Sequence, residues 1–281
     1  MKVTAQRYSF LFVLMLLLLL PVVGGAVKPN YDESEESILK SRSSYTTTLS
    51  VNNRSLTYFA QNSPEWSDLR VSDESWRTMG ESECSVLALA NTLVNVLEPD
   101  QIPAILDLAK KPVMVDTKQA GYKGGYSKEY KFVIGTPDDI IRFLPLVIAN
   151  ITSGNNTFGF QDSFIVSSYK KFFKHFDLEY SLTSESAVCY DALAKGAMVI
   201  VCSGGSDSPI GPKFGHYFVL AGIDDEYVYC LDSIYRNKYP DDRKNVIELI
   251  QPGLFRYRID NSRQMQMHGT KYIVYPARNK R

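Results

Sequence analysis

Three residues that lie far apart in the sequence have the types and settings needed for hydrolysis by a thiol. Cys84 opens a long apolar run, His216 opens a β-type run, and Asp232 closes the next β-type run. A thiol at a helix N-terminus is favoured as a thiolate by the helix dipole and the free backbone N–H groups. A histidine can polarise such a thiol, and a carboxylate can fix the histidine ring. The pattern predicts a site for amide cleavage through a thioester, with Cys84 as nucleophile, His216 as base and Asp232 as orienting acid.

The contact between His216 and Asp232 depends on the turn that joins their two strands. With a three-residue loop, Ile223-Asp224-Asp225, the two side chains stand directly opposite each other, with Cβ atoms about 5 Å apart. A two-residue loop would pair His216 with Ser233 and would turn Asp232 to the other face of the hairpin. The catalytic interpretation therefore predicts the three-residue loop.

Each of the three residues also has a purely structural interpretation. A cysteine in an apolar helix is usually a small buried hydrophobic residue, and a histidine beside aromatic residues is usually structural. An aspartate at a strand end commonly caps a turn. Glu81 and Glu83 also oppose a thiolate at Cys84, because neighbouring negative charge disfavours it.

The elements that must position these residues can be read from periodicity and punctuation. The run from Cys84 is apolar nearly all round, which predicts a buried helix that Ser82 caps and that ends before Pro99. Further helices are predicted at 101–110, 136–151, 163–176 and 184–195, and β-type runs at 197–202, 216–223, 227–232 and 271–275. Helices followed by strands predict an α+β fold, with an antiparallel sheet packed on the N-terminal helices.

The N-terminal residues 1–26 have the layout of a secretory signal peptide. Lys2 and Arg7 precede an apolar run, and small residues follow it. An uncleaved anchor is the alternative, but the run is short for a bilayer core of about 30 Å. We expect a secreted or cell-envelope protein with no membrane span after cleavage. Residues 27–56 are predicted to be a polar linker or pro-segment, 57–276 the folded domain, and 277–281 a basic tail.

The composition restricts the partners and cofactors that we expect. The 31 Lys and Arg residues balance the 31 Asp and Glu residues, which argues against nucleic acid as the partner. The histidines 175, 216 and 268 lack the spacing of metal ligands, so neither a metal nor another cofactor is predicted. With Cys84 as nucleophile an odd number of cysteines remains. We expect Cys189, Cys202 and Cys230 to be free thiols, with a single bridge among them as the alternative.

Four stretches resemble one protein family in their order and spacing. They are YFAQNSPEW at 58–66, TMGESEC at 78–84, GHYFVL at 215–220 and LDS at 231–233. Over residues 57 to 240 the chain resembles the exported bacteriocin-processing-peptidase-like domains of bacteria, which belong to the papain-like superfamily. The resemblance implies a papain-like α+β fold, with the nucleophile helix packed on an antiparallel sheet. It assigns Cys84, His216 and Asp232 the same three roles.

The chain departs from the family pattern at three places. Glu83-Cys84-Ser85-Val86 stands where the family usually has Gly-Cys-Gly-Pro, and Ser233 stands where it favours proline. Thr78 occupies the position, six residues before the cysteine, at which papain-like peptidases carry a glutamine. Gln61 is a candidate substitute that would donate to the oxyanion, and an ordinary loop glutamine is the alternative.

These observations predict an exported thiol hydrolase that cleaves an amide bond in a peptide or protein, with the cell envelope as one setting. Two alternatives remain open. One is a catalytically inactive papain-like module that binds a peptide or a cell-envelope component. The other is an acyl transferase that uses the same triad and passes the acyl group of the thioester to an amine.

Overall fold

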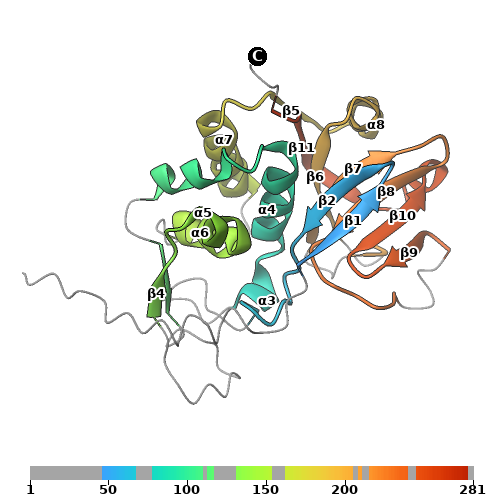
Figure 1. Ribbon diagram of the computed structural model, residues 1–281. Helices are drawn as coiled ribbons and strands as arrows, with labels where there is room; N and C mark the ends of the chain where they lie inside the picture. The colour runs from blue at the N-terminus through green and yellow to red at the C-terminus, as the bar shows by residue number, and fades with distance from the viewer. Residues whose placement is uncertain are drawn as a thin grey trace, which may run out of the picture. The chain divides into compact units, whose positions relative to one another are not determined.

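A seven-stranded antiparallel sheet forms the centre of the fold (Figure 1), and its strand order is β5-β11-β6-β7-β8-β10-β9. The strands are β5 (Tyr180–Thr183), β6 (Met198–Ser203), β7 (His216–Ile223), β8 (Tyr227–Asp232), β9 (Ile247–Gln251), β10 (Leu254–Arg258) and β11 (Met267–Val274). The α+β class and the antiparallel sheet are therefore as the sequence predicts. The runs predicted at 197–202, 216–223, 227–232 and 271–275 all form strands of this sheet.

The computed structural model describes residues 46–67, 78–109, 113–116, 131–153, 162–204, 208–210, 215–239 and 245–277. All of them belong to one unit of the chain, Asp32–Arg281. The predicted signal peptide at 1–26 and the last four residues of the predicted basic tail lie outside the described residues. Within the described part of the chain, no helix combines the length and apolar character that crossing a membrane requires.

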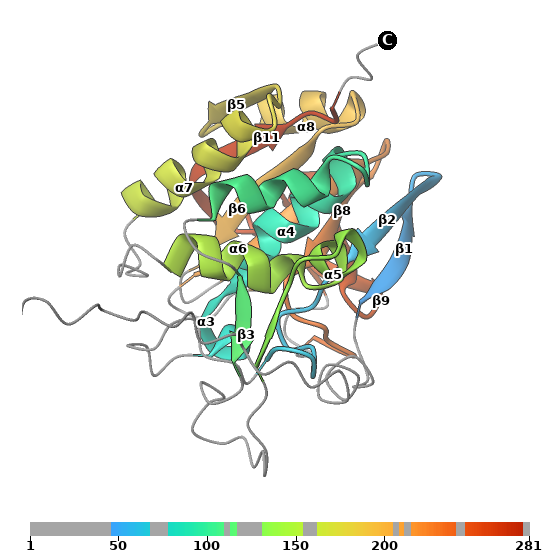
Figure 2. The ribbon, with the colours of Figure 1, turned by 60° about the vertical axis from the view of Figure 1, so that its left-hand side comes forward.

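Helices cover both faces of the sheet, because its central strands bury side chains on both sides (Figures 1 and 2). In β7, Val219 and Ala221 belong to one core, whereas Phe218 and Leu220 belong to the other. The first face carries α4 (Cys84–Val96), α5 (Pro137–Arg142), α6 (Leu144–Ser153), α7 (Asp162–His175) and the 3₁₀ helix η1 (Ile102–Leu108). The second face carries α8 (Ser186–Ala194).

Helix α4, which begins at Cys84, is buried along most of its length, as its apolar pattern predicts. Two of its side chains, Asn91 and Asn95, act as a strand partner for the segment beside the helix. Asn91 accepts from Phe59 N at 2.8 Å and donates to Phe59 O at 3.0 Å. Asn95 makes the equivalent pair of hydrogen bonds with Thr57, at 2.8 and 2.7 Å. The helix and the extended chain at 57–59 are thereby fixed to each other.

The start of α4 differs from the prediction. Its N-cap is Glu83, which makes no side-chain cap hydrogen bond, and not Ser82. A short helix, α3 (Met79–Ser82), immediately precedes it, and the Ser82 hydroxyl bonds to Thr78 O and Glu83 Oε1 instead. Glu83 is therefore the hinge between two consecutive helices, and Cys84 is the first residue of the second one.

The helix predicted at 136–151 is two helices. Thr136 does cap α5, because its hydroxyl accepts from Asp139 N at 3.2 Å. The chain then breaks at Phe143 and continues as α6, whose second residue is Pro145. Proline has no N–H for the bond to residue i−4, and its ring clashes with that carbonyl, so one continuous helix is excluded. The predicted helices at 163–176 and 184–195 are present, and the one at 101–110 is the 3₁₀ helix η1.

The largest correction concerns the predicted linker at 27–56. From Thr47 onward this segment is a β-hairpin, formed by β1 (Thr47–Val51) and β2 (Arg54–Tyr58). Leu49, Val51 and Leu56 are buried in the core of the first face, beside α4. The predicted α+β order also omitted β5, β9, β10 and the small pair β3 (Met114–Asp116) and β4 (Lys131–Val133).

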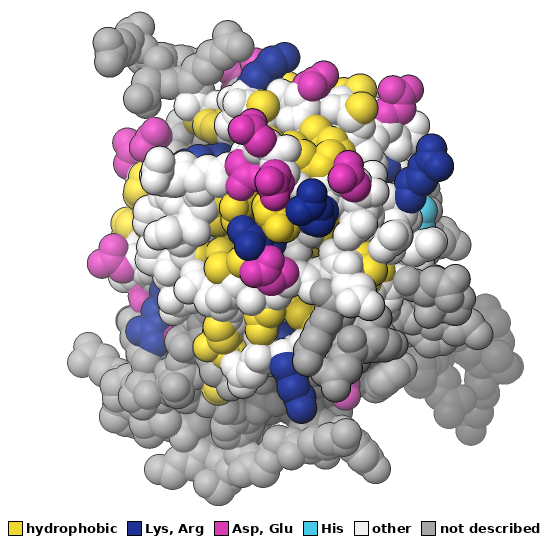
Figure 3. Space-filling model, turned by 90° about the vertical axis from the view of Figure 1, so that its right-hand side faces the viewer, with side chains coloured by type: hydrophobic (Ala, Val, Ile, Leu, Met, Phe, Trp, Pro, Cys, Tyr) yellow, Lys and Arg dark blue, Asp and Glu magenta, His cyan; other side chains and the backbone are white. Residues whose placement is uncertain are grey.

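Figure 3 shows the face at the right of Figure 1, where acidic and basic side chains are interspersed among hydrophobic ones. Several charged side chains in β9, β10 and the β7–β8 turn region are paired. Arg256 binds Glu248 at 2.8 Å and stacks on the Tyr227 ring, and Arg258 lies 3.4 Å from Glu226. These exposed pairs each contribute less than about 1 kcal/mol to stability.

Candidate functional site

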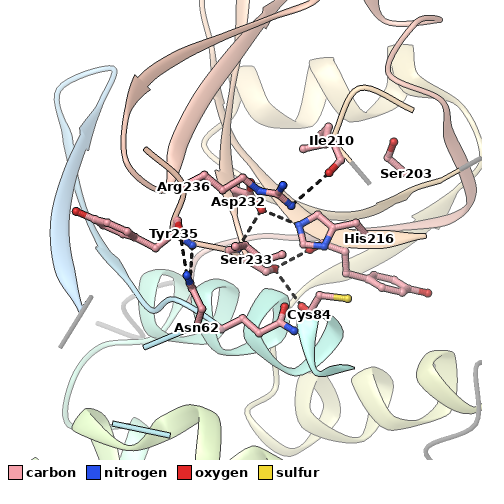
Figure 4. Close-up of polar contacts among 12 residues, drawn as sticks. Asn62, Cys84, Ser203, Ile210, His216, Asp232, Ser233, Tyr235 and Arg236 are labelled. Atoms are coloured by element: carbon pink, nitrogen blue, oxygen red, sulfur yellow. Dashed lines mark hydrogen bonds and ion pairs between the residues drawn. The ribbon is translucent and has the colours of Figure 1, made fainter. Parts of the chain in front are cut away.

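The three residues singled out in the sequence meet at one end of the sheet (Figure 4). Cys84 begins α4, His216 begins β7 and Asp232 ends β8. Cys84 is half-buried and lies close enough to His216 to raise its pKa, whereas His216 is 2% exposed and Asp232 is fully buried. The structure thus brings together a thiol, an imidazole and a carboxylate from three separate elements.

His216 Nε2 lies 2.6 Å from Asp232 Oδ1, so the predicted contact is present, but the predicted register is wrong. The turn has a two-residue loop, Asp225-Glu226, closed by the hydrogen bond from Asp224 N to Tyr227 O. Phe218, and not His216, pairs with Asp232. The two side chains are therefore diagonal neighbours on one face and not direct partners.

An extra residue in β7 explains why the contact survives the shorter loop. The register shifts at Ala221, between the pairs Leu220–Cys230 and Gly222–Tyr229. Without this bulge, Asp232 would pair with Val219 and would face away from His216. The bulge restores the alternation, so that His216 and Asp232 project from the same face.

The Asp232 carboxylate receives four hydrogen bonds. Oδ1 accepts from His216 Nε2 at 2.6 Å and from Ile234 N at 3.0 Å. Oδ2 accepts from Arg236 Nε at 2.9 Å and from the Tyr239 hydroxyl at 2.6 Å. These donors occupy about all the lone-pair positions of a carboxylate. Burial raises the pKa of Asp232. His216, the Arg236 charge and the Tyr239 hydroxyl together lower it by more, so the net pKa lies below 3.8.

His216 holds its proton strongly. Burial lowers the pKa of His216, but the charge and hydrogen bond of Asp232, together with the hydrogen bond to Cys84, raise it to about 9. The ring is therefore an imidazolium at neutral pH. Because Asp232 occupies Nε2, the nitrogen that remains for the thiol is Nδ1. A cation at this place favours negative charge on a neighbouring atom.

The segment after β8 links the Asp232 carboxylate to helix α4. The Ser233 hydroxyl lies 2.6 Å from Tyr217 O and 3.1 Å from Cys84 O, and shares its proton between these carbonyls. Two residues later, Tyr235 exchanges two backbone hydrogen bonds with the Asn62 side chain, at 2.8 and 3.1 Å. Within this segment, residues 234 and 236 therefore donate hydrogen bonds to the Asp232 carboxylate. Residues 233 and 235 bind to neighbouring elements.

Gln61 lies beside this segment, since its N–H donates to Ser233 O at 2.6 Å. The side chain is 3% exposed, and one amide proton is donated to Gly80 O in α3 at 3.1 Å. Its Oε1 is buried and has no hydrogen-bond partner among the residues that the structure describes. The second amide proton is the group that an oxyanion role would use. The backbone N–H groups in the first turn of α4 are further donors, because an α-helix leaves them without internal partners.

The two acidic residues beside Cys84 lie in different environments. Glu81 is exposed, whereas Glu83 is 2% exposed and accepts from the Ser82 hydroxyl at 2.9 Å. A buried carboxylate beside Cys84 disfavours further negative charge at this place, because water screens it poorly. Glu83 is therefore the feature of the site that least suits catalysis.

The other cysteines and histidines have separate environments. All four cysteines are free thiols. Cys202 is half-buried like Cys84, whereas burial raises the pKa of Cys189 to about 11 and also raises the pKa of Cys230. His175 binds Ala104 O and His268 binds Gln266 O. In the described ranges, no three His, Cys, Asp or Glu residues are grouped so that they could hold a metal ion.

The sequence analysis missed two residues of the site, Arg236 and Tyr239, and it gave Ser233 no role there. Arg236 and Tyr239 follow Asp232 by four and seven residues, with no regular element between them. The signal that could have found them is a polar and aromatic stretch directly after an aspartate that was already singled out.

Comparison of the chain with protein-family models, curated proteins and solved structures finds no match.

Proposed function

We propose that the chain is a thiol hydrolase that cleaves an amide bond, most simply a peptide bond, in a peptide or protein. The observation that carries this proposal is the placement of His216. Its Nε2 is held 2.6 Å from Asp232 Oδ1, and Cys84 lies close enough to the same ring to raise its pKa. A ring fixed in this way can exchange a proton with the sulfur and with a group bound beside it.

In the first half of the reaction, Cys84 Sγ bonds to the carbonyl carbon of the substrate. The electron pair of the C=O bond moves to the oxygen, which backbone N–H groups of the first turn of α4 stabilise. His216 then gives its proton to the leaving nitrogen as the C–N bond breaks. The products are a free amine and a thioester on Cys84.

In the second half, a water molecule hydrolyses the thioester. The neutral His216 accepts a proton from the water, whose oxygen bonds to the carbonyl carbon. The C–S bond breaks, the carboxylic acid leaves, and the sulfur becomes a thiolate again beside a protonated His216. Throughout both halves Asp232 stays ionised and keeps the ring in position, because four donors hold it.

The same proposal includes a papain-like fold and a place of action outside the cytoplasm. A cysteine at the first residue of a buried helix, packed against an antiparallel sheet that supplies histidine and aspartate from adjacent strands, supports the fold. The signal-peptide pattern of residues 1–26 supports export to a secreted or cell-envelope location.

Glu83 favours a second candidate, an inactive module that binds a peptide or a cell-envelope component. Its buried carboxylate adjoins Cys84, and it occupies the position at which the family that the chain resembles usually has glycine. In this case Cys84→Ala would keep the full biological effect of the protein. If the protein is a hydrolase, Cys84→Ala should abolish its biological effect.

The rate at which iodoacetamide alkylates each cysteine near neutral pH tests the proposal that the protein is a hydrolase. Cys84 and Cys202 are both half-buried, so access alone predicts similar rates for the two thiols. We expect Cys84 to react at least about tenfold faster than any other cysteine, because only the thiolate reacts. His216→Gln should remove this advantage, with peptide mapping by mass spectrometry as the measurement. Equal labelling of Cys84 and Cys202 would contradict the proposal that the protein is a thiol hydrolase.

A further inference from the structure

We propose that Arg236 is a positioning residue that limits how strongly Asp232 holds the proton on His216, and so makes that proton available to the leaving group. The inference rests on the proposed function and adds a residue to it. Its basis is a line of alternating charges, namely the His216 imidazolium, the Asp232 carboxylate and the Arg236 guanidinium (Figure 4).

The guanidinium and the imidazolium share one carboxylate, one on each oxygen. Arg236 Nε lies 2.9 Å from Oδ2, and His216 Nε2 lies 2.6 Å from Oδ1. The aspartate is fully buried, and the His216 side chain is 3% exposed, so water screens these charges poorly. A second cation on the same carboxylate repels the proton on His216. The imidazolium therefore gives up that proton more easily.

Arg236 is fixed where it exerts this effect. Its guanidinium lies 5.5 Å from the centroid of the Tyr239 ring, and Nη2 contacts Ile210 O at 3.4 Å. Tyr239 itself donates to Oδ2 and packs edge-on against Phe255 in the core. The side chain of Arg236 is 24% exposed, so part of its charge is solvated and its effect is a partial one.

A general acid works best when it does not hold its proton too tightly. His216 beside Asp232 alone would be a stable imidazolium and a poor donor to the leaving amine. Among the residues that the structure describes, the other ionisable groups near the pair carry no positive charge that could oppose the proton. They are the phenols of Tyr58, Tyr235 and Tyr239, the thiols of Cys84 and Cys230, and the carboxyl group of Glu83 beside Cys84.

The test is the titration midpoint of His216, followed by NMR of the imidazole in the full chain. Arg236→Gln and Arg236→Met both remove the charge, and the methionine preserves packing on Tyr239. We expect the midpoint to rise by about one pH unit in both variants, since one nearby cation is lost. An unchanged or lowered midpoint in folded protein would overturn the proposal, because a purely structural arginine would loosen Asp232 and lower it.

Arg258→Gln is the matched control. The Arg258 side chain is 50% exposed. Arg258 stands opposite Tyr227 in the β8–β10 ladder, at the end of β10 remote from Asp232, so its substitution should not change the titration midpoint of His216. Circular dichroism reports folding, and unfolding of both neutral variants would assign Arg236 a structural role and overturn the inference. If His216 in the wild type titrates near or below 6.5, the proposed function itself fails. If the wild type titrates near 9 and the neutral variants match it, only the role of Arg236 fails.

Discussion

At the scale of single residues, Asp232 determines what His216 can do. Its carboxylate is saturated by four donors, so it stays ionised and cannot turn away from the ring. Burial by itself would make His216 a neutral imidazole. The charge of Asp232 reverses this, and the result is a protonated ring that faces the Cys84 thiol.

The titration of His216 provides the first prediction. In the wild type its pKa should lie near 9, whereas Asp232→Asn should lower it below 6.5, because burial then acts without the opposing charge. Cys84→Ala should lower it by less. NMR of the imidazole protons measures all three values, and the chain has only three histidines, so single substitutions of His175 and His268 assign the signals. A wild-type midpoint near 6.5 would contradict the ion pair.

The second prediction concerns Glu83, whose buried carboxylate opposes a thiolate at Cys84. Glu83→Gln keeps the shape of the side chain and removes its charge. The alkylation rate of Cys84 near neutral pH should rise roughly three- to tenfold, because a negative charge beside the sulfur is removed. Glu81→Gln is the control, since Glu81 is exposed and water screens its charge. A rate that is unaltered by Glu83→Gln would show that its charge does not reach the thiol.

At the scale of elements, two devices place the site residues. The asparagines of α4 hold the backbone at Thr57 and Phe59, which leads on to Gln61. The bulge at Ala221 sets the face from which His216 projects. Both devices act through backbone geometry, and both lie outside the three residues that would perform the chemistry.

Removal of the Asn91 side chain should destabilise the fold considerably. Asn91→Ala leaves the N–H and C=O of Phe59 without partners in a buried position, which costs about 2–4 kcal/mol. Asn150→Ala in α6 is the control, because that side chain is exposed and its bond to Leu146 O is easily replaced by water. Urea unfolding measures both. A loss below about 1 kcal/mol for Asn91→Ala would mean that the clamp contributes little.

The β1–β2 hairpin can be tested through Gly222. A Cβ on this residue would lie 2.7 Å from Val51 Cγ1, so Gly222→Ala should push the hairpin from β7 and cost about 1–3 kcal/mol. Gly135→Ala is the control, since nothing described lies within 4 Å of its Cβ position. Thermal unfolding of the two variants gives the comparison. Equal stability would contradict the packing of the hairpin on the sheet.

At the scale of the whole molecule, the ion pair should appear in the dependence of stability on pH. His216 binds its proton more tightly in the folded chain, so its contribution is complete below pH 6.5 and is lost as the pH rises through about 9. Asp232 has a lowered pKa, so its contribution is complete above pH 3.8 and is lost as the pH falls through the lowered value. Free energies of unfolding for wild type and His216→Gln should therefore converge between pH 6.5 and 9. A constant difference across that range would contradict the raised pKa.

The sequence predicts much of this molecule, because strong local signals mark the elements that matter. The apolar run from Cys84 and the strands that begin at His216 and end at Asp232 are set by the local pattern of apolar residues. The register of β7 and β8 escapes prediction, because a bulge at Ala221 leaves no mark in the residue pattern. The hairpin at 47–58 was missed because each of its strands has only five residues, of which two are buried.

The site was predictable to the same extent. Cys84, His216 and Asp232 each stand at the end of an apolar run, which made them visible. Arg236, Tyr239 and Ser233 act through an irregular segment whose path no periodicity encodes. The role of Gln61 stays a prediction, since its amide binds Gly80 O.

The central claim is that Cys84 attacks a carbonyl while His216 supplies a proton. A peptide vinyl sulfone tests both parts at once, because its adduct forms only when a thiolate adds to one carbon and a proton reaches the next. We expect a single adduct on Cys84 in the wild type and at least about a hundredfold slower labelling in His216→Gln, measured by intact and peptide mass spectrometry. Labelling shared equally with Cys202, or a rate that His216→Gln leaves unchanged, would contradict the account.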